Sequence, residues 1–253
     1  WTPDVYEGAP TAITAFFAIV PKLAGIALIY RFCLEPFGGF VDEWRQIIIF
    51  LSIASMFVGA IAAIVQTNLK RLLAYSSIGH TGYLLIGLAS ANSMGIKGLL
   101  IYITIYLLMN VGIFTVILSL KIKDRYVEYL SDLSGMSKKK PIFSLCIAIV
   151  MFSLAGIPPF AGFFGKFYIF IAALKSGLIY LAVLGVIASV ISAYYYLRII
   201  KIMYFDESQL SYQSYLSKKS TLILFISIIA ISLFIVYPSF LINISSHVSS
   251  SYF

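Results

Sequence analysis

Seven apolar segments, each long enough to cross a lipid bilayer, constrain this chain more than any other feature of its sequence. A membrane-spanning helix needs about 20 consecutive apolar residues. Only 11% of the 253 residues are charged, whereas about 25% are charged in a soluble domain. The sequence therefore predicts an all-α polytopic membrane protein with about seven transmembrane helices. The segments are residues 11–33, 46–66, 71–90, 96–120, 141–174, 177–205 and 220–242.

The polar stretches at either end complete the predicted organisation. We expect residues 1–10 to form a loop on the cytoplasmic side, 11–242 to form the helical bundle, and 243–253 to form a polar tail. The first residues, WTPDVYEGAPT, contain neither the charged nor the apolar region of a signal peptide. We therefore expect the chain to be the later part of a longer protein.

Basic residues are distributed unequally between the two ends of the predicted bundle. Twelve lie on the side where the chain begins, four lie on the opposite side, and the remaining two, Lys22 and Lys166, lie within apolar segments. The excess of positive charge marks the cytoplasmic side, so the net charge of +8 does not indicate a nucleic-acid partner. The twelve are Lys70, Arg71, Lys121, Lys123, Arg125, Lys138, Lys139, Lys140, Arg198, Lys201, Lys218 and Lys219.

Lys22 lies at the midpoint of the segment 11–33. Either bilayer surface is then about 15 Å away, which is too far for the side chain to reach. An ionised lysine at this depth costs about 2.5–3.5 kcal/mol, and such residues usually have a function. Pro21 precedes it, removes a helix hydrogen bond, and predicts a break in the helix. The alternative is a lysine that pairs with a neighbouring helix for packing alone.

The segment 141–174 is too long for one straight membrane helix and carries helix breakers at its centre. Pro158 and Pro159 exclude regular helix there, and Gly156, Gly162 and Gly165 are expected to permit bends and close backbone approach. Interrupted helices of this kind mark ion pathways in transporters. Lys166 follows the break, so we expect it to lie in a polar pocket that the break opens. A simple proline kink with an incidental lysine is the alternative.

His80 lies near the middle of the segment 71–90. Its ordinary pKa near 6.5 suits a proton relay, and Ser76, Ser77 and Tyr83 could continue a hydrogen-bonded path. Packing of the histidine against a neighbouring helix is an equally good interpretation. Tyr102 and Tyr106, one turn apart, suggest aromatic packing rather than a relay.

No motif indicates a metal or cofactor site in this chain. Cys33 and Cys146 are far apart, no CxxC or Cys/His cluster occurs, and no dinucleotide-binding fingerprint is present. All ten carboxylates lie in loops or at segment ends. A partner for either membrane lysine must therefore come from water, another subunit, or a part of the protein outside this sequence.

Three motifs together resemble the antiporter-like membrane subunits of respiratory complex I, and among these the N type. They are WTPDVYEGAPT, QTNLKRLLAYSSIGHTGYLL and SLAGIPPFAGFFGKF. The resemblance extends to about residue 242 and implies helices 8–14 of a fourteen-helix fold. Lys22 then matches the central lysine of helix 8, Lys166 the lysine of the broken helix 12, and His80 the histidine of helix 10. The M-type members usually have glutamate at the place of Lys166, which favours the N type.

The resemblance implies a proton-translocating subunit of an NADH-quinone oxidoreductase. NADH, FMN, iron–sulfur clusters and quinone would be bound by other subunits. The partners would be other membrane subunits, especially neighbouring antiporter-like and small subunits, and the lipid bilayer. A bacterial inner membrane is expected, with the mitochondrial inner membrane as the alternative. The competing functions are a subunit of a multisubunit cation/proton antiporter, a subunit of a membrane-bound hydrogenase, and a membrane scaffold that does not pump protons.

Overall fold

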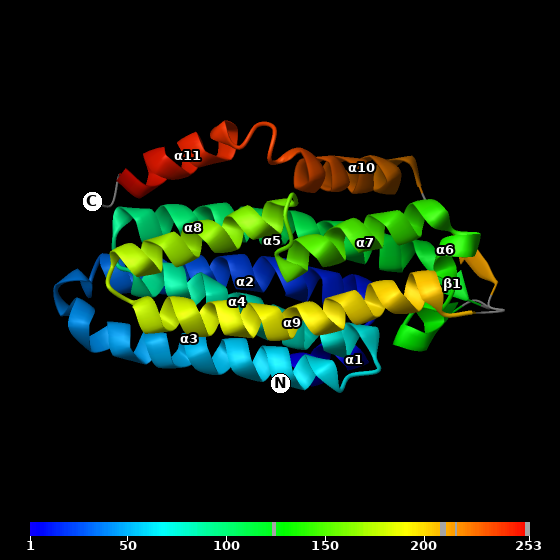
Figure 1. Cartoon of the computed structure of the whole chain (residues 1–253), viewed down its shortest axis with the longest axis horizontal. Helices are drawn as coiled ribbons and strands as arrows, with labels where there is room; N and C mark the ends of the chain where they lie inside the picture. Colours follow the sequence, from blue (N-terminus) through cyan, green and yellow to red (C-terminus); the bar gives the residue numbers. More distant parts are fainter. Residues whose placement is uncertain (123–124, 208–210, 216, 251–253) are drawn as a thin grey trace.

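Long helices that run side by side make up most of the molecule (Figure 1). The computed structural model describes residues 1–122, 125–207, 211–215 and 217–250. Within these residues, five helical segments are long and apolar enough to cross a membrane. The prediction of an all-α polytopic membrane protein is confirmed. The five segments are Thr11–Leu34, Gly38–Ile64, Leu69–Ala89, Ser93–Ser119 and Ile179–Phe205.

Helices α4 (Leu69–Ala89) and α5 (Ser93–Ser119) form the centre of the bundle and are buried along most of their length. Each begins at an asparagine whose side chain accepts a hydrogen bond from the first turn, Asn68 for α4 and Asn92 for α5. Outer helices surround them and leave large apolar side chains exposed, as expected for surfaces that face lipid. The outer helices include α2 (Thr11–Leu34), α3 (Val41–Ile64, preceded by η1, Gly38–Phe40) and α9 (Ile179–Phe205).

The predicted break at Pro21 is wrong. Helix α2 continues through Pro21 from Thr11 to Leu34. Proline lacks only one N–H and disturbs one turn of the hydrogen-bond ladder. The turns on either side still form, so the helix persists, and Lys22 lies on a continuous helix.

The predicted break at Pro158 and Pro159 is confirmed. Helix α7 (Pro141–Ala155) ends before this pair and α8 (Ala161–Lys175) begins after it. Gly156 closes α7 in the left-handed region, at φ 85°, which a residue with a Cβ rarely adopts. Its N–H donates to the carbonyls of Phe152 and Ser153. The single long segment is thus two short helices.

Gly162 and Gly165 do not form part of the break, which corrects the expected bend at these two residues, whereas the expected close approach of the backbone is observed. Both lie inside α8. A Cβ on Gly162 would lie 1.8 Å from the Ser153 carbonyl oxygen, and one on Gly165 would lie 2.5 Å from the Tyr102 ring. Their missing side chains allow α8 to approach α7 and α5 closely.

The last segment, expected as one helix over 220–242, is two helices. Helix α10 (Lys218–Leu233) ends before Pro238, and α11 (Ser239–Ser250) begins after it. Pro238 disfavours helical conformation at the residue before it, so α10 and α11 remain separate helices. The expected polar tail over 243–253 forms the second half of α11 as far as Ser250, and α11 packs against α5. Residues 251–253 lie outside the described residues.

The expected loop over residues 1–10 contains a short helix, α1 (Thr2–Gly8), with a proline in its first turn. This helix packs against α4 and α2. Its Tyr6 side chain is buried in the hydrophobic core. The first residues are therefore part of the bundle and not merely a connection to it.

Two hydrophilic linkers meet at one end of the bundle, where a small antiparallel sheet forms (Figure 1). Its strand order is β2-β1-β3, with β1 at Leu120–Ile122, β2 at Arg125–Tyr126 and β3 at Tyr212–Ser214. Lys121 lies opposite both Tyr126 and Gln213. The turn η2 (Leu130–Leu133) and helix α6 (Met136–Lys139) lead from the sheet into α7. Of the twelve basic residues assigned to this side, Lys123 lies outside the described residues.

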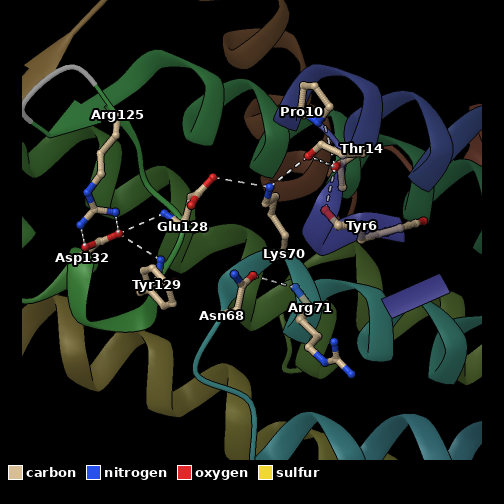
Figure 2. Close-up of polar contacts among 11 residues, drawn as sticks. Tyr6, Pro10, Thr14, Asn68, Lys70, Arg71, Arg125, Glu128, Tyr129 and Asp132 are labelled. Atoms are coloured by element: carbon tan, nitrogen blue, oxygen red, sulfur yellow. Dashed lines mark hydrogen bonds and ion pairs between the residues drawn. The ribbon is translucent and has the colours of Figure 1, made fainter. Parts of the chain in front are cut away.

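Asp132 organises the linker between β2 and α6. Its carboxylate accepts two hydrogen bonds from Arg125, at 2.9 and 2.8 Å, and two more from the N–H groups of Glu128 and Tyr129 (Figure 2). Burial raises the pKa of Asp132, but these hydrogen bonds outweigh it, so the pKa lies below its ordinary value.

Candidate functional site

The Lys22 ammonium group lies between three helices and is held by polar groups from α4 and α5. Its Nζ donates to the Ser77 carbonyl oxygen at 2.8 Å, to the Ser77 hydroxyl, and to the Tyr106 hydroxyl at 2.9 Å. Nζ also lies 4.5 Å from the centre of the Tyr106 ring, within the range of a cation–π contact. Within the described residues, Lys22 forms no ion pair with a carboxylate. Three acceptors match the three N–H donors of an ammonium group.

A cavity of about 250 Å³ opens beside Lys22. This volume is sufficient for several water molecules, since one water molecule needs at least about 10–15 Å³. The lining combines Lys22 and Ser77 with apolar side chains. The other lining residues are Trp1, Thr2, Tyr6, Phe17, Pro21, Gly25, Ile26, Ile29, Ile78 and Thr81.

Lys166 is held by the helix break itself. Its Nζ donates to the carbonyl oxygens of Leu154 at 3.1 Å and Ala155 at 3.0 Å, the last two residues of α7. The last carbonyls of a helix have no partner within the helix and carry its partial negative charge. The break thus supplies the acceptors that a buried ammonium group needs. The Lys166 side chain is only 5% exposed, and the polar groups around it are these carbonyls at the break.

Two further features complete the Lys166 environment. Nζ donates to the Ser189 hydroxyl of α9 at 2.8 Å. A Cβ at position 156 would lie 3.0 Å from the Lys166 Cδ and 3.2 Å from Nζ. Gly156 therefore ends α7 and also leaves space for the lysine.

His80 lies in the centre of α4, is 2% exposed, and joins three helices by hydrogen bonds. Its Nδ1 lies 2.6 Å from the Tyr102 hydroxyl of α5, and its Nε2 lies 2.9 Å from the Tyr196 hydroxyl of α9. The Tyr196 hydroxyl is also bonded to the Ser76 hydroxyl at 2.5 Å. A neutral imidazole has one donor and one acceptor nitrogen, so both nitrogens are satisfied without charge.

Aromatic rings connect the three titratable groups into one row. Tyr106, which binds Lys22, has its ring 4.9 Å from the His80 ring between centroids. On the other side of His80, the Tyr83 ring lies 6.0 Å from it, and the Lys166 Nζ lies 5.0 Å from the Tyr83 centroid. The row runs from Lys22 through His80 to Lys166. The structure therefore brings together the three residues that the sequence singled out.

Several residues of this row were missed or misread in the sequence. Tyr102 and Tyr106 are not only packing residues, because their hydroxyls bind His80 and Lys22. Tyr196 and Ser189 were not identified. A signal for the tyrosines was present, since two hydroxyls one turn apart in an apolar helix need hydrogen-bond partners. Ser189 had no such signal, because a serine in a membrane helix often bonds its own backbone.

Within the described residues, no group of three or more His, Cys, Asp or Glu side chains is arranged to hold a metal ion. Cys33 and Cys146 are both buried and free. The polar groups of the row are lysine, histidine, tyrosine and serine, whose chemistry is proton transfer and hydrogen bonding.

Comparison with known proteins identifies the family of this chain. Residues 1–192 match the family model described as NADH:quinone oxidoreductase/Mrp antiporter, TM. The chain belongs to this family. Subunit N of NADH-quinone oxidoreductase from Paramagnetospirillum magneticum is 53% identical over 243 residues, which are 96% of this chain and 50% of the relative. The corresponding subunit of Methylobacterium nodulans is 52% identical over 253 residues, covering 100% of this chain and 52% of the relative. The chain spans about half the length of these curated relatives.

Solved structures of the family have the same fold. A chain in respiratory complex I from Thermus thermophilus with bound aureothin matches with a TM-score of 0.82 and 31% identity, over 96% of this chain and 53% of that one. The membrane-bound sulfane sulfur reductase, an archaeal respiratory membrane complex, matches with a TM-score of 0.83 and 26% identity, over 100% of this chain and 51% of that one. The Mrp complex from Dietzia sp. DQ12-45-1b matches with a TM-score of 0.81 and 21% identity, over 99% of this chain and 55% of that one. At this identity the match shows the fold alone. The resemblance drawn from the three motifs is confirmed.

Proposed function

We propose that this chain forms part of a proton-translocating membrane subunit of an NADH-quinone oxidoreductase. The observation that carries the proposal is the buried row from Lys22 through His80 to Lys166. Two uncompensated lysines inside apolar helices are costly, and a scaffold would gain nothing from them. The relatives named as subunit N support the choice of complex.

The contacts of both lysines suit a group that gains and loses a proton. The hydroxyls of Ser77 and Tyr106 accept from Lys22 when it is charged, and can donate to it when it is neutral. The Ser189 hydroxyl can reverse its role toward Lys166 in the same manner. Each lysine therefore has hydrogen-bond partners in both protonation states. A charge brought close to such a site, or removed from it, changes which state is favoured.

In this proposal His80 relays protons between the two lysines. A proton that arrives at one ring nitrogen makes the ring cationic, and the proton on the other nitrogen then leaves, which restores a neutral ring in the other tautomer. The Tyr102 and Tyr196 hydroxyls, bonded to the two nitrogens, hold the ring for this exchange. In this scheme Lys22 is the central carrier and Lys166 controls release toward the outer side.

Energy for the transfer would come from outside the chain. We propose that NADH, FMN, iron–sulfur clusters and quinone are bound by other subunits. Neighbouring membrane subunits, both antiporter-like and small ones, would transmit the charge or conformational change that drives proton transfer. A subunit of a cation/proton antiporter or of another membrane-bound respiratory complex is the second candidate, because the Mrp complex and the sulfane sulfur reductase have the same fold. Purification of the native complex and a test for NADH-driven quinone reduction distinguishes the two.

Replacement of His80 tests whether the row conducts protons. In an assembled complex that carries the full-length subunit, His80→Gln is expected to lower proton pumping by about 100-fold while quinone reduction changes less. Glutamine keeps hydrogen bonding to Tyr102 and Tyr196 but does not titrate, and a proton-transfer group typically contributes about 10²–10⁴ to a rate. Pumping is measured by dye quenching in inverted vesicles. Wild-type pumping by His80→Gln would assign His80 to helix packing.

The orientation of the bundle is a second part of the proposal. The basic linkers mark the end with the small sheet as cytoplasmic, so Ser131 in η2 should face the cytoplasm and Ser250 the outside. Cysteine is introduced at either position in a background where Cys33 and Cys146 are alanine. An impermeant thiol reagent is expected to label Ser250→Cys in intact cells and Ser131→Cys only in inverted vesicles. Labelling of Ser131→Cys in intact cells would reverse the orientation.

We place the subunit in a bacterial plasma membrane, because the relatives compared above are bacterial proteins. The mitochondrial inner membrane is the alternative. The labelling experiment above applies to either membrane once it is isolated with a known side outward.

A further inference from the structure

Five lysines gather at one end of the bundle, where the helices α7 and α10 begin. Three of them occupy positions 138–140, directly before α7, and the other two, Lys218 and Lys219, open α10. The two helices pack against each other and start at the same end (Figure 1). The Lys140 Nζ donates to the hydroxyl of Ser214 at 2.9 Å, shortly before α10 begins. The two basic runs therefore form one surface, which we call the lysine cluster.

Few carboxylates neutralise the lysine cluster. Within the described residues, four of its five members form no ion pair with a carboxylate, namely Lys138, Lys140, Lys218 and Lys219. Most carboxylates on the same side of the bundle are bound to other cations instead. They are Asp4 and Glu7 with Arg71, Asp132 with Arg125 and Glu128 with Lys70 (Figure 2), and Asp206 with Lys201. Glu207 is exposed after α9, so among the described residues the surface keeps an excess of positive charge.

Exposed apolar side chains follow the lysine cluster in the first two turns of both helices. On α7 they are Ile142 and Leu145, and on α10 they are Leu222 and Phe225. The members of each pair are three positions apart and so share one face of their helix. At about 1.5 Å per residue, they lie within about 10 Å of the lysines along the helix axes. The surface thus changes from cationic to apolar over about the thickness of the headgroup region of one bilayer leaflet.

We propose that the lysine cluster is a binding site for an anionic phospholipid, whose phosphate headgroup contacts the lysines and whose acyl chains pack on α7 and α10. Each lysine near an anionic membrane surface strengthens binding about fivefold, whereas a lipid without net charge gains little from the cluster. An acidic segment of another protein would match the lysines but not the apolar side chains next to them. The inference does not depend on the proposed proton path.

Photolabelling in the assembled complex tests this site. The complex that carries the full-length subunit is reconstituted into phosphatidylcholine vesicles with a small fraction of phosphatidylglycerol, which has a photoactivatable group at the top of one acyl chain. After illumination, lipid adducts are mapped by digestion and mass spectrometry. We expect phosphatidylglycerol to label the starts of α7 and α10 at least about tenfold more than phosphatidylcholine with the same group, because several lysines each contribute about fivefold. High salt is expected to reduce this difference, since it screens exposed charges.

Two variants that each remove two charges provide the decisive comparison. Lys218→Gln combined with Lys219→Gln is expected to lower phosphatidylglycerol labelling about 25-fold, fivefold for each lysine. The matched control is Lys97→Gln combined with Lys175→Gln, which removes the same charge near the other end of the bundle, in the first turns of α5 and at the end of α8. This control is expected to leave the labelling unchanged. Blue-native gels verify that both variants assemble.

Several results would overturn the inference. Equal labelling by the two lipids would show that charge does not select the headgroup. Full labelling in the assembled variant at Lys218 and Lys219, or an equal loss in the control, would show that these lysines do not form the site. An absence of lipid adducts on α7 and α10 would assign the surface to contact with a neighbouring subunit.

Discussion

A complex that carries Lys22→Ala is expected to assemble and to lose proton pumping by at least about 100-fold, the lower range for the removal of a proton-transfer group. The loss of Lys22 removes an uncompensated charge from an apolar segment, which lowers a desolvation cost. One of its former acceptors, the Ser77 carbonyl, keeps a partner, because it also accepts from the Thr81 hydroxyl at 3.0 Å. Assembly on blue-native gels and dye-quenching assays in inverted vesicles measure the two effects separately.

Lys22→Arg distinguishes a proton carrier from a structural cation. Arginine keeps the positive charge, but its pKa above 12 prevents it from releasing a proton near neutral pH. We therefore expect Lys22→Arg to pump nearly as poorly as alanine. Lys175→Ala, an exposed lysine at the end of α8, is the control and should pump normally. Normal pumping by assembled Lys22→Ala would remove Lys22 from the path.

Lys166→Ala is expected to reduce pumping and coupled quinone reduction together, by at least about 100-fold, because it removes another proton-transfer group. Unlike Lys22→Ala, it should also destabilise the subunit. The Leu154 carbonyl at the end of α7 loses the donor that it shares with the Ala155 carbonyl, and a buried acceptor left unpaired costs about 1–3 kcal/mol. The Ala155 carbonyl keeps a donor, the Ser189 hydroxyl at 3.4 Å. Thermal unfolding of the purified complex and the two activity assays measure these effects.

Lys166→Arg tests which property of Lys166 matters. Arginine can donate to the same two carbonyls and restore the end of α7, so stability should return. We expect part of the pumping and of the quinone reduction to return with it, because the charge is kept while proton release is lost. Full activity of Lys166→Arg would make Lys166 an electrostatic element and not a proton carrier.

The two lysines have different surroundings, and for this reason we expect different effects from Lys22→Ala and Lys166→Ala. Lys22 lies beside a cavity and is bound partly by hydroxyls, which adapt to either protonation state. Lys166 is 5% exposed and is bound mainly by carbonyls that accept only. Carbonyl acceptors favour the charged form more strongly. A central carrier and a more slowly exchanging gate are consistent with these environments.

The sequence by itself determined which segments enter the membrane, where the long segment is broken, and which residues are chemically unusual. Length and hydropathy decide bilayer insertion, and two consecutive prolines, Pro158 and Pro159, disrupt the interior of a helix. A lysine within an apolar segment is visible without any structure, so Lys22 and Lys166 were found, and three ordered motifs identified the family. These properties are local, because each depends on a residue and its neighbours in the chain.

Only the tertiary structure decided what each of these residues contacts. Lys22 meets Tyr106, 84 positions away, and His80 meets Tyr196, 116 positions away. The groups that Gly162 and Gly165 approach, and the burial of Tyr6, were known only once α7, α5 and α4 were in place. The hydropathy of these helices is nearly uniform around their axes, since lipid and protein interior are both apolar. Hydropathy therefore does not set the rotation of each helix, and close packing between distant segments determines which hydroxyls face the lysines.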